Sequence, residues 1–199
     1  MAKYYILLLF LLNSCIGIPT DYPENEYYTL SKENLNFEFS ESFPYSIYID
    51  EVSISSEYED VFIKYTDEDS KVEKYHYHRW IDSPSNLIQN YFNNLMIKSK
   101  IFENGVFTSK RRIIPDLMLN IEILDLSSYE DYVELTINFT VIKYDKINSE
   151  NTLFYQKYFN KKTERESSKA NSIPVAFNKA IQELSKDFID EFYIKLQND

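Results

Sequence analysis

Between residues 75 and 102 the spacing of apolar side chains changes from every second residue to the 3.6-residue period of a helix. This change constrains the fold more than any other feature of the sequence. Residues 75–80 read Tyr-His-Tyr-His-Arg-Trp. Alternation predicts a strand with the two tyrosines and Arg79 on one side and the two histidines and Trp80 on the other. A helical period then takes over, so a strand must run directly into a helix.

The helix has a defined start. Ser83 can accept hydrogen bonds from the free N–H groups of the first turn, and Pro84 suits the first helical position, which needs no N–H donor. Apolar residues then recur at helical spacing up to about Phe102 and give the helix one apolar face: Leu87, Ile88, Tyr91, Phe92, Leu95 and Met96. A flat apolar surface must receive this face.

Further alternating segments predict strands around residues 45–54, 61–65, 117–123, 132–144 and 152–161, with a short extended piece at 106–107. A second amphipathic helix is predicted from about residue 172 to 196. Three strands and a helix, followed by three more strands and a helix, favour the α+β class. We expect residues 41–199 to form one domain, with a single mostly antiparallel or mixed sheet and both helices on one face.

Composition excludes several functions. The chain has two glycines, Gly17 and Gly105, so it cannot build a glycine-rich loop that cradles phosphate. Its formal net charge of −11 opposes binding to nucleic acid and adsorption to anionic lipid. Contact with a membrane therefore needs another device.

The N-terminus supplies this device. One lysine precedes a nine-residue apolar run at residues 4–12, which is short for a membrane span. The run leads into Ser14 and Cys15, the only cysteine of the chain. Residues 1–14 resemble a bacterial lipoprotein signal peptide, with cleavage between Ser14 and Cys15 and lipid attachment at Cys15. The alternative is an ordinary secretory signal followed by an incidental cysteine.

Two or three acyl chains on Cys15 would hold the protein at a membrane without a transmembrane helix. Residues 15–40 contain two prolines and many polar residues without sustained periodicity, so we expect an acylated N-terminus and a flexible tether. Ile16 follows the cysteine where an aspartate would signal inner-membrane retention. This favours the outer over the inner membrane, on the periplasmic face of the envelope.

Catalytic and metal sites find little support. His76 and His78 have a spacing used in some metal sites, but no third ligand is evident, and exposed strand histidines are the favoured interpretation. The carboxylates at 57–60 and 67–69 fall in turns, where acidic residues are common, and no Gly-x-Ser-x-Gly motif occurs. We predict a protein that is not an enzyme and needs neither a metal nor a cofactor.

Arg79 and Trp80 form the candidate partner contact, because arginine and tryptophan are enriched at binding hot spots. The alternative for Trp80 is a core position beneath the first helix, which we favour, while the role of Arg79 stays open. The two apolar helix faces could likewise form a lipid-holding groove, although helices that cover a sheet more commonly just close a core.

Several of these features together resemble the ABC-type transport auxiliary lipoprotein family, the PqiC-like lipoproteins associated with MCE-domain proteins. They are the lipobox at Cys15, Arg79-Trp80 before a helix that starts with proline, the strand beginning at Asp116-Leu117-Met118-Leu119, and the late helix. The resemblance covers residues 44–196. Ile81 departs from the family pattern, which commonly has alanine after the tryptophan.

The resemblance implies a non-catalytic adaptor or tether of an MCE-type lipid transport system. Its implied partners are an MCE-domain protein and the ABC permease and ATPase complex, and homo-oligomerisation stays open. The alternative is an assembly or structural lipoprotein of the outer membrane that binds a β-barrel partner.

Overall fold

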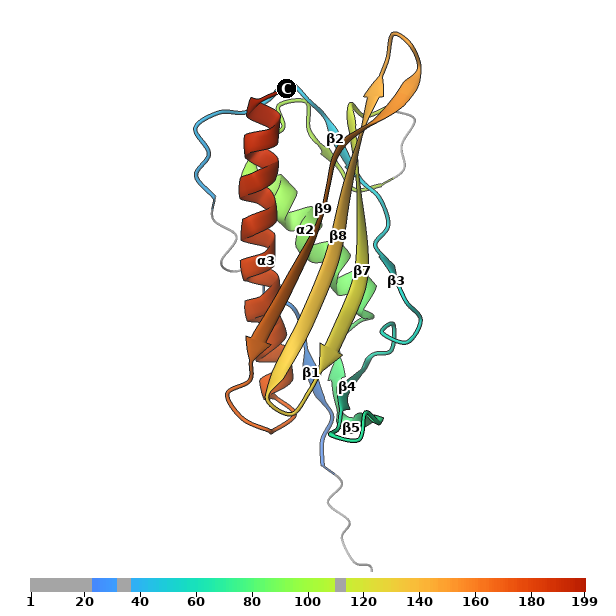
Figure 1. Cartoon of the computed structure of the whole chain (residues 1–199), viewed down its shortest axis with the longest axis vertical. Coiled ribbons are helices and arrows are strands. Elements are labelled where there is room, and N and C mark those ends of the chain that lie inside the picture. The colour runs from blue at the N-terminus through green and yellow to red at the C-terminus, as the bar shows by residue number, and fades with distance from the viewer. Residues whose placement is uncertain (1–22, 32–36, 110–113) are drawn as a thin grey trace, which may run out of the picture.

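The computed structural model describes residues 23–31, 37–109 and 114–199. Cys15 and Ser14, with the whole predicted signal peptide, lie outside these residues. Within the described ranges, no helix is both long and apolar enough to cross a membrane. The described chain forms an elongated α+β structure, which confirms the predicted fold class (Figure 1).

The larger of two sheets has the strand order β6-β2-β7-β8-β9, and β3 also pairs with β7. Three long strands pair antiparallel and form most of it, while the short strands pair parallel to their neighbours, so the sheet is mixed as expected. The bounds are β2 Ile47–Ile49, β3 Ser53–Ile54, β6 Val106–Phe107, β7 Leu117–Ser128, β8 Tyr132–Asp145 and β9 Glu150–Glu164.

Both helices cover the same face of this sheet, as the sequence predicts. Phe139 of β8 contacts Phe92 of α2 (Pro84–Ser99) at 5.1 Å between ring centroids, and it stacks on Phe188 of α3 (Ser172–Gln197) at 3.9 Å. These three rings are fully buried. One strand residue that touches both helices places both on one face.

The start of α2 follows the sequence prediction. The Ser83 hydroxyl accepts a hydrogen bond from the Asn86 N–H at 3.4 Å, and Pro84 is the first helical residue. The helix ends at Ser99, three residues before the predicted end, because Lys100 takes a left-handed conformation with φ of 56°. Phe102 then pairs with Phe43 in an isolated parallel bridge.

The prediction of a single sheet was wrong. A second, three-stranded sheet has the order β1-β5-β4, in which β1 is Glu26–Tyr28, β4 is Phe62–Thr66 and β5 is Val72–Trp80. The composition of β5 explains this difference. Polar residues occur on both sides of β5 and its only buried residue is Trp80, so β5 has no apolar side to place in the large sheet, whose inner face is apolar along β7 and β8.

The predicted tether is also shorter than expected. Residues 26–28 pair parallel with β5, and Leu30 is buried with 7% exposure. The Asn178 side chain of α3 accepts a hydrogen bond from the Ser31 N–H at 2.5 Å and donates one to the Thr29 carbonyl at 3.2 Å. Three residues give too little alternation to reveal a strand in the sequence, so the polar composition dominated the prediction.

Asp116 joins the starts of β2 and β7. Its carboxylate accepts hydrogen bonds from the Ser46 N–H at 2.8 Å and the Ser46 hydroxyl at 2.6 Å, and it pairs with Lys146 at 2.5 Å. Burial acts to raise the pKa of this carboxyl, but the Lys146 and Ser46 hydrogen bonds outweigh burial and hold the pKa below its usual value.

We therefore expect Asp116→Asn to lower the free energy of unfolding by about 1–3 kcal/mol at pH 7. A depressed folded-state pKa gives stability that is present above the unfolded-state pKa and is lost as pH falls through the folded-state value. The deficit should shrink at pH 3 in urea titrations of the mature chain carrying Cys15→Ser. Asp69→Asn is the control, and an equal deficit at both pH values would contradict this account.

The ring cluster around Phe188 supplies a second prediction. Phe188 is fully buried and contacts Phe92, Phe139, Tyr155, Phe159 and Phe192. Phe188→Ala should lower the free energy of unfolding by about 3–5 kcal/mol, because it removes apolar contacts and leaves a cavity. The control is Ile147→Ala, a residue with 92% exposure, which should change stability by less than about 0.5 kcal/mol in the same titration.

Candidate functional site

The small sheet forms the lower end of the molecule and contains residues 75–80, the strand part of the opening sequence motif (Figure 1). Its central strand carries a large bulge. Phe62 pairs with Arg79 and Lys64 pairs with Lys74, so β4 advances by two residues where β5 advances by five. Residues 75–78 of β5 leave the ladder with β4, although His78 still pairs with Glu26 of β1. Bulges of this kind are common next to functional sites.

Because of the bulge, the side chains of β5 do not alternate as the sequence predicts. Tyr75 and His78 were expected on opposite sides of the strand, yet their rings meet edge to face at 5.7 Å between centroids. An odd number of extra residues inverts the alternation along β5, which brings the two side chains to the same side. Tyr65 of β4 and Tyr28 of β1 complete a row of rings with them, at 4.8 Å from Tyr75 and 6.0 Å from His78.

Carboxylates hold both ends of this row. The Tyr65 hydroxyl donates to Glu73 at 2.7 Å, and this hydrogen bond, with the nearby charge, raises the pKa of Tyr65 to about 12. Glu73 also pairs with Lys71, which, with Tyr65, holds the pKa of the Glu73 carboxyl below its usual value. These contacts fix the rings in place and leave the tyrosines protonated at neutral pH.

The other end of the row fastens β1 to β5. His78 Nδ1 lies 3.0 Å from the Tyr28 hydroxyl oxygen and 3.5 Å from the Glu26 carboxylate. The Tyr28 hydroxyl also donates to Glu26, and burial together with this carboxylate raises the pKa of Tyr28. His78 thus acts as a contact between strands in this structure.

The opposite side of the small sheet combines cations with exposed apolar side chains. The Arg79 guanidinium lies 4.4 Å from the centroid of the Phe62 ring, and the Lys74 ammonium lies 4.3 Å from it. Three apolar side chains close to Arg79 in register or sequence are exposed. We call them the exposed apolar group: Tyr27 at 58%, Tyr77 at 39% and Ile81 at 65% exposure.

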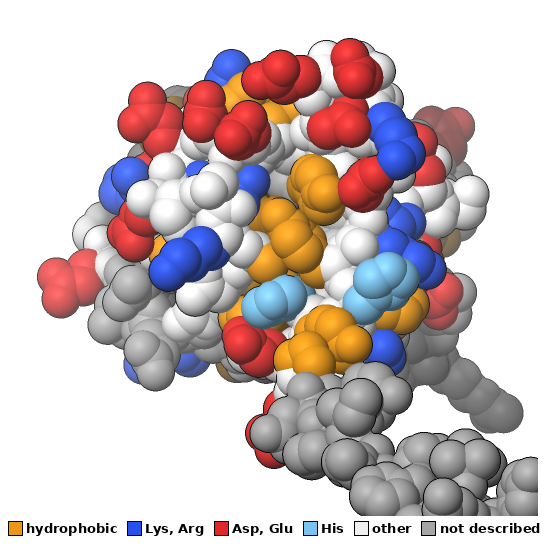
Figure 2. All heavy atoms as spheres, turned by 90° about the horizontal axis from the view of Figure 1, so that it is seen from below, with side chains coloured by type: hydrophobic (Ala, Val, Ile, Leu, Met, Phe, Trp, Pro, Cys, Tyr) orange, Lys and Arg blue, Asp and Glu red, His pale blue; other side chains and the backbone are white. Residues whose placement is uncertain are grey.

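Figure 2 views the molecule from this lower end. Both histidines of the chain are on the surface there, and apolar side chains lie between them. Acidic side chains are most numerous along one border of this view, and single acidic and basic side chains lie beside the apolar area. The lower end therefore combines apolar side chains and both histidines with charged side chains around them.

Trp80 is a core residue, as favoured from the sequence. It is 6% exposed and meets Phe177 of α3 edge to face at 6.1 Å, so it is not available to a partner in this structure. Arg79 remains partly exposed and is the member of the pair that a partner could reach. Trp80 thus takes the core position that the sequence favoured, and a partner contact at Arg79 stays a prediction.

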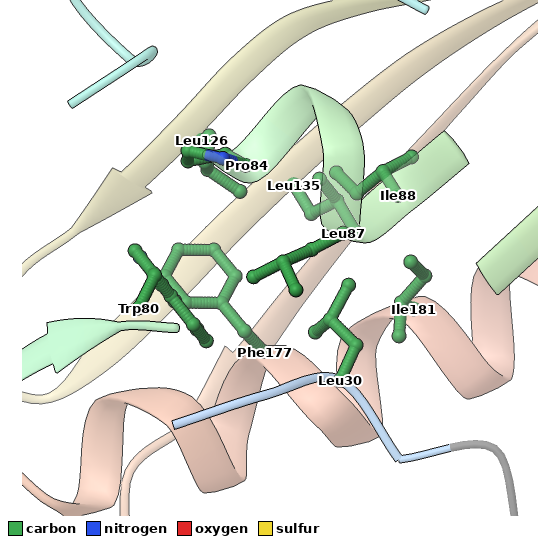
Figure 3. Close-up of a pocket in the computed structure, with 9 residues that line it drawn as sticks. All are labelled: Leu30, Trp80, Pro84, Leu87, Ile88, Leu126, Leu135, Phe177 and Ile181. Carbon is green, nitrogen blue, oxygen red and sulfur yellow. The ribbon is translucent and has the colours of Figure 1, made fainter. Parts of the chain in front are cut away.

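An apolar pocket lies between Trp80 and the two helices (Figure 3). Leu30 points into it from the N-terminal segment and meets side chains of both helices. The open space is only about 10 Å³, roughly what one water molecule needs, so the helix faces close a core and leave no lipid-sized groove here. Its lining residues are Leu30, Trp80, Pro84, Leu87, Ile88, Leu126, Leu135, Phe177 and Ile181.

A larger cleft of about 340 Å³ separates β4 from the end of β7 and the start of α3. Trp80 and Phe177 belong to its wall as well as to the apolar pocket. The Lys64–Asp60 ion pair, at 3.5 Å, also borders the cleft. The small sheet is thus a separate layer, joined to the main body through Trp80, the N-terminal segment, the buried Ile63 of β4 and a hydrogen bond from the Ser128 hydroxyl of β7 to the Lys64 carbonyl.

The remaining candidate residues are placed as follows. Cys15 and Ser14 lie outside the described residues. His76 is exposed, while His78 contacts Tyr28. Among the residues the structure describes, no group of three or more histidine, cysteine, aspartate or glutamate side chains could hold a metal ion.

The sequence reasoning missed the N-terminal contributors to this end of the molecule, Tyr27, Tyr28 and Leu30. A signal was present, because residues 26–30 read Glu-Tyr-Tyr-Thr-Leu, a stretch rich in residues that favour strands within an otherwise polar segment. Three residues on the edge of a sheet are too few to recognise by periodicity alone.

Comparison with known proteins gives a fold and no more. Neither a family model nor a curated protein matches the sequence. Among solved structures, protein XCC0632 from Xanthomonas campestris, of the family DUF330, aligns with a TM-score of 0.70 at 12% identity. The alignment covers 87% of this chain and 98% of that protein.

Two further structures are similar. An uncharacterised protein aligns with a TM-score of 0.64 at 10% identity, over 85% of this chain and 99% of its own. The hypothetical protein CT253 from Chlamydia trachomatis aligns with a TM-score of 0.50 at 9% identity, over 80% of this chain and its full length. At such identities the likeness establishes a shared fold.

Leu30 provides a test of how the N-terminal segment is attached. Leu30→Asp would place a charge in the apolar pocket, so residues 26–31 should leave the domain while the rest stays folded. Chymotrypsin should then cut after Tyr27 or Tyr28 at least about tenfold faster, since cleavage follows the population of the open form.

The control for this digestion is Thr29→Asp, which adds the same charge at an exposed neighbouring position. Equal cleavage rates in Leu30→Asp and the unchanged chain would show that Leu30 does not hold the segment.

Proposed function

We propose that this protein is a lipid-anchored, non-catalytic adaptor on the periplasmic face of the cell envelope that serves an MCE-type ABC lipid transport system. Its acyl chains are carried by Cys15. Its partners are an MCE-domain protein and the permease and ATPase complex, and the absence of aspartate after Cys15 favours the outer membrane.

The attachment of the N-terminal segment is the observation that carries this proposal. Pairing of Glu26–Tyr28 with β5 and burial of Leu30 fix the chain to the domain from the eleventh residue after Cys15 onward. A short connection between the anchor and the domain holds the domain near the membrane, which raises its local concentration where a transporter arrives.

The chemistry of the lower end supports a role in binding. Its ionisable side chains are held in structural hydrogen bonds, as in the Tyr65–Glu73 and Tyr28–His78 pairs. Exposed tyrosines and the partly exposed Arg79 belong to the residue types that dominate binding energies at interfaces. The geometry thus suits recognition of a surface.

Lipid attachment is tested by metabolic labelling with an alkyne analogue of palmitate in a Gram-negative host. We expect the protein to take up the label and to fractionate with membranes, and Cys15→Ser to lose both properties. Ser42→Ala, at an exposed hydroxyl, is the control and should keep both. Membrane retention of Cys15→Ser without label would contradict the anchor.

The partner is tested by photo-crosslinking of the acylated protein in its native envelope. A photoreactive amino acid is placed at Tyr77, at Ile147 and at Tyr158, three exposed positions on different parts of the domain. Recovery of an MCE-domain protein or a permease from at least one position is expected. Recovery of a barrel-assembly component in its place would favour the alternative, an assembly or structural lipoprotein.

A further inference from the structure

The position of β1 limits how far the lower end can lie from the membrane. Pro23, the first described residue, is the eighth residue after Cys15. At about 3.3–3.6 Å per residue, this length reaches at most about 28 Å when fully extended. A flexible chain of this length has a typical end-to-end distance of about 16 Å.

The chain from the proposed anchor at Cys15 enters the domain at its lower end. Pro23 and β1 lie at the lower end of the molecule, and the C-terminus lies at the opposite end together with the β8–β9 hairpin (Figure 1). Since β1 is fixed by its pairing with β5, the acylated cysteine cannot slide along the domain. The small sheet is therefore the part of the domain nearest the bilayer.

The surface that faces the bilayer in this arrangement carries the exposed apolar group. Tyr27 pairs in register with Arg79, and Tyr77 and Ile81 flank Arg79 along the chain at two residues on either side. Register partners point to the same side of a sheet, so Tyr27 and Arg79 share one side of the small sheet. Tyr77 lies in the bulge and Ile81 just after the strand, both close to Arg79 in sequence. The Arg79 guanidinium also donates to the His76 carbonyl at 3.4 Å. The arginine itself stacks on Phe62.

This combination fits the interfacial layer of a membrane. Tyrosine is enriched at the level of lipid head groups, because its ring is apolar and its hydroxyl stays hydrated. The arginine can pair with lipid phosphate, for which its planar fork is suited. The acidic side chains at this end and the net charge of −11 make strongly anionic lipid a poor partner, so the surface fits zwitterionic phospholipid.

We propose that the small sheet docks on the zwitterionic phospholipid surface beside the anchor, with Tyr27, Tyr77 and Ile81 at head-group depth around Arg79. This inference rests on the proposed anchoring at Cys15. Docking fixes the orientation of the domain, so that the β8–β9 hairpin points away from the membrane and the polar face of the large sheet stays open to a partner.

The test uses the full mature lipoprotein in liposomes of phosphatidylethanolamine and phosphatidylcholine that contain a head-group quencher. Cys15 is the only cysteine and its thiol is consumed by acylation, so one introduced cysteine can be labelled with a fluorophore. His76→Cys places the label on the bulge of the small sheet, and Ile147→Cys places it on the β8–β9 hairpin, where the side chain is 92% exposed.

We expect the label at 76 to be quenched at least about twofold more than the label at 147, because interfacial docking brings it within about 10 Å of the head groups. Adding Tyr27→Asp and Tyr77→Asp to His76→Cys should abolish the difference, while protein still floats with the liposomes. Tyr158→Asp, at 59% exposure on the large sheet, is the matched control and should keep the difference.

The outcomes separate this inference from the proposed function. Flotation with equal quenching at both positions, or stronger quenching at 147, would overturn the docking and leave the anchor intact. Failure of the protein to float would overturn the anchor and the docking together. Quenching that survives both aspartate substitutions would show that the exposed apolar group does not mediate the contact.

Discussion

The stacking of Phe139 on Phe188, at 3.9 Å between ring centroids, fixes the long helix α3 on the large sheet, and the lower end of the molecule depends on it. With α3 in place, Phe177 near its start receives Trp80 and thereby holds the end of β5. β5 in turn pairs with β1. Contacts between buried aromatic rings therefore connect the core, through Trp80 and β5, to residues 26–28 of β1.

The attachment of β1 to β5 bears on how the proposed lipid anchor would hold the domain. A flexible linker of 25 residues would let the domain rotate freely and present any surface. Attachment of Glu26–Tyr28 to β5 shortens the free part and selects one end of the domain. Orientation then comes from a three-residue strand and one buried leucine, so selection on a few residues could tune it without changes to the core.

The sequence predicted the elements whose period extends over many residues. Both helices and the long strands of the large sheet follow their patterns, and the capping by Ser83 was found because its chemistry is local. β1 was missed because three residues carry no period. The inverted alternation at His78 was missed because a bulge is decided by pairing with β4, which no local pattern records. The single sheet was predicted for the same reason, because local sequence patterns do not show which strands pair with each other.

The central claim is that the end of the domain beside the anchor is the end that meets the membrane. Hydrogen exchange of the acylated protein, compared with and without liposomes, tests this claim most directly, because it reports every backbone amide at once. The account predicts slower exchange on membrane binding in residues 24–31 and 72–81, and unchanged exchange in the hairpin at 145–150. Slower exchange confined to that hairpin or to the large sheet would contradict it.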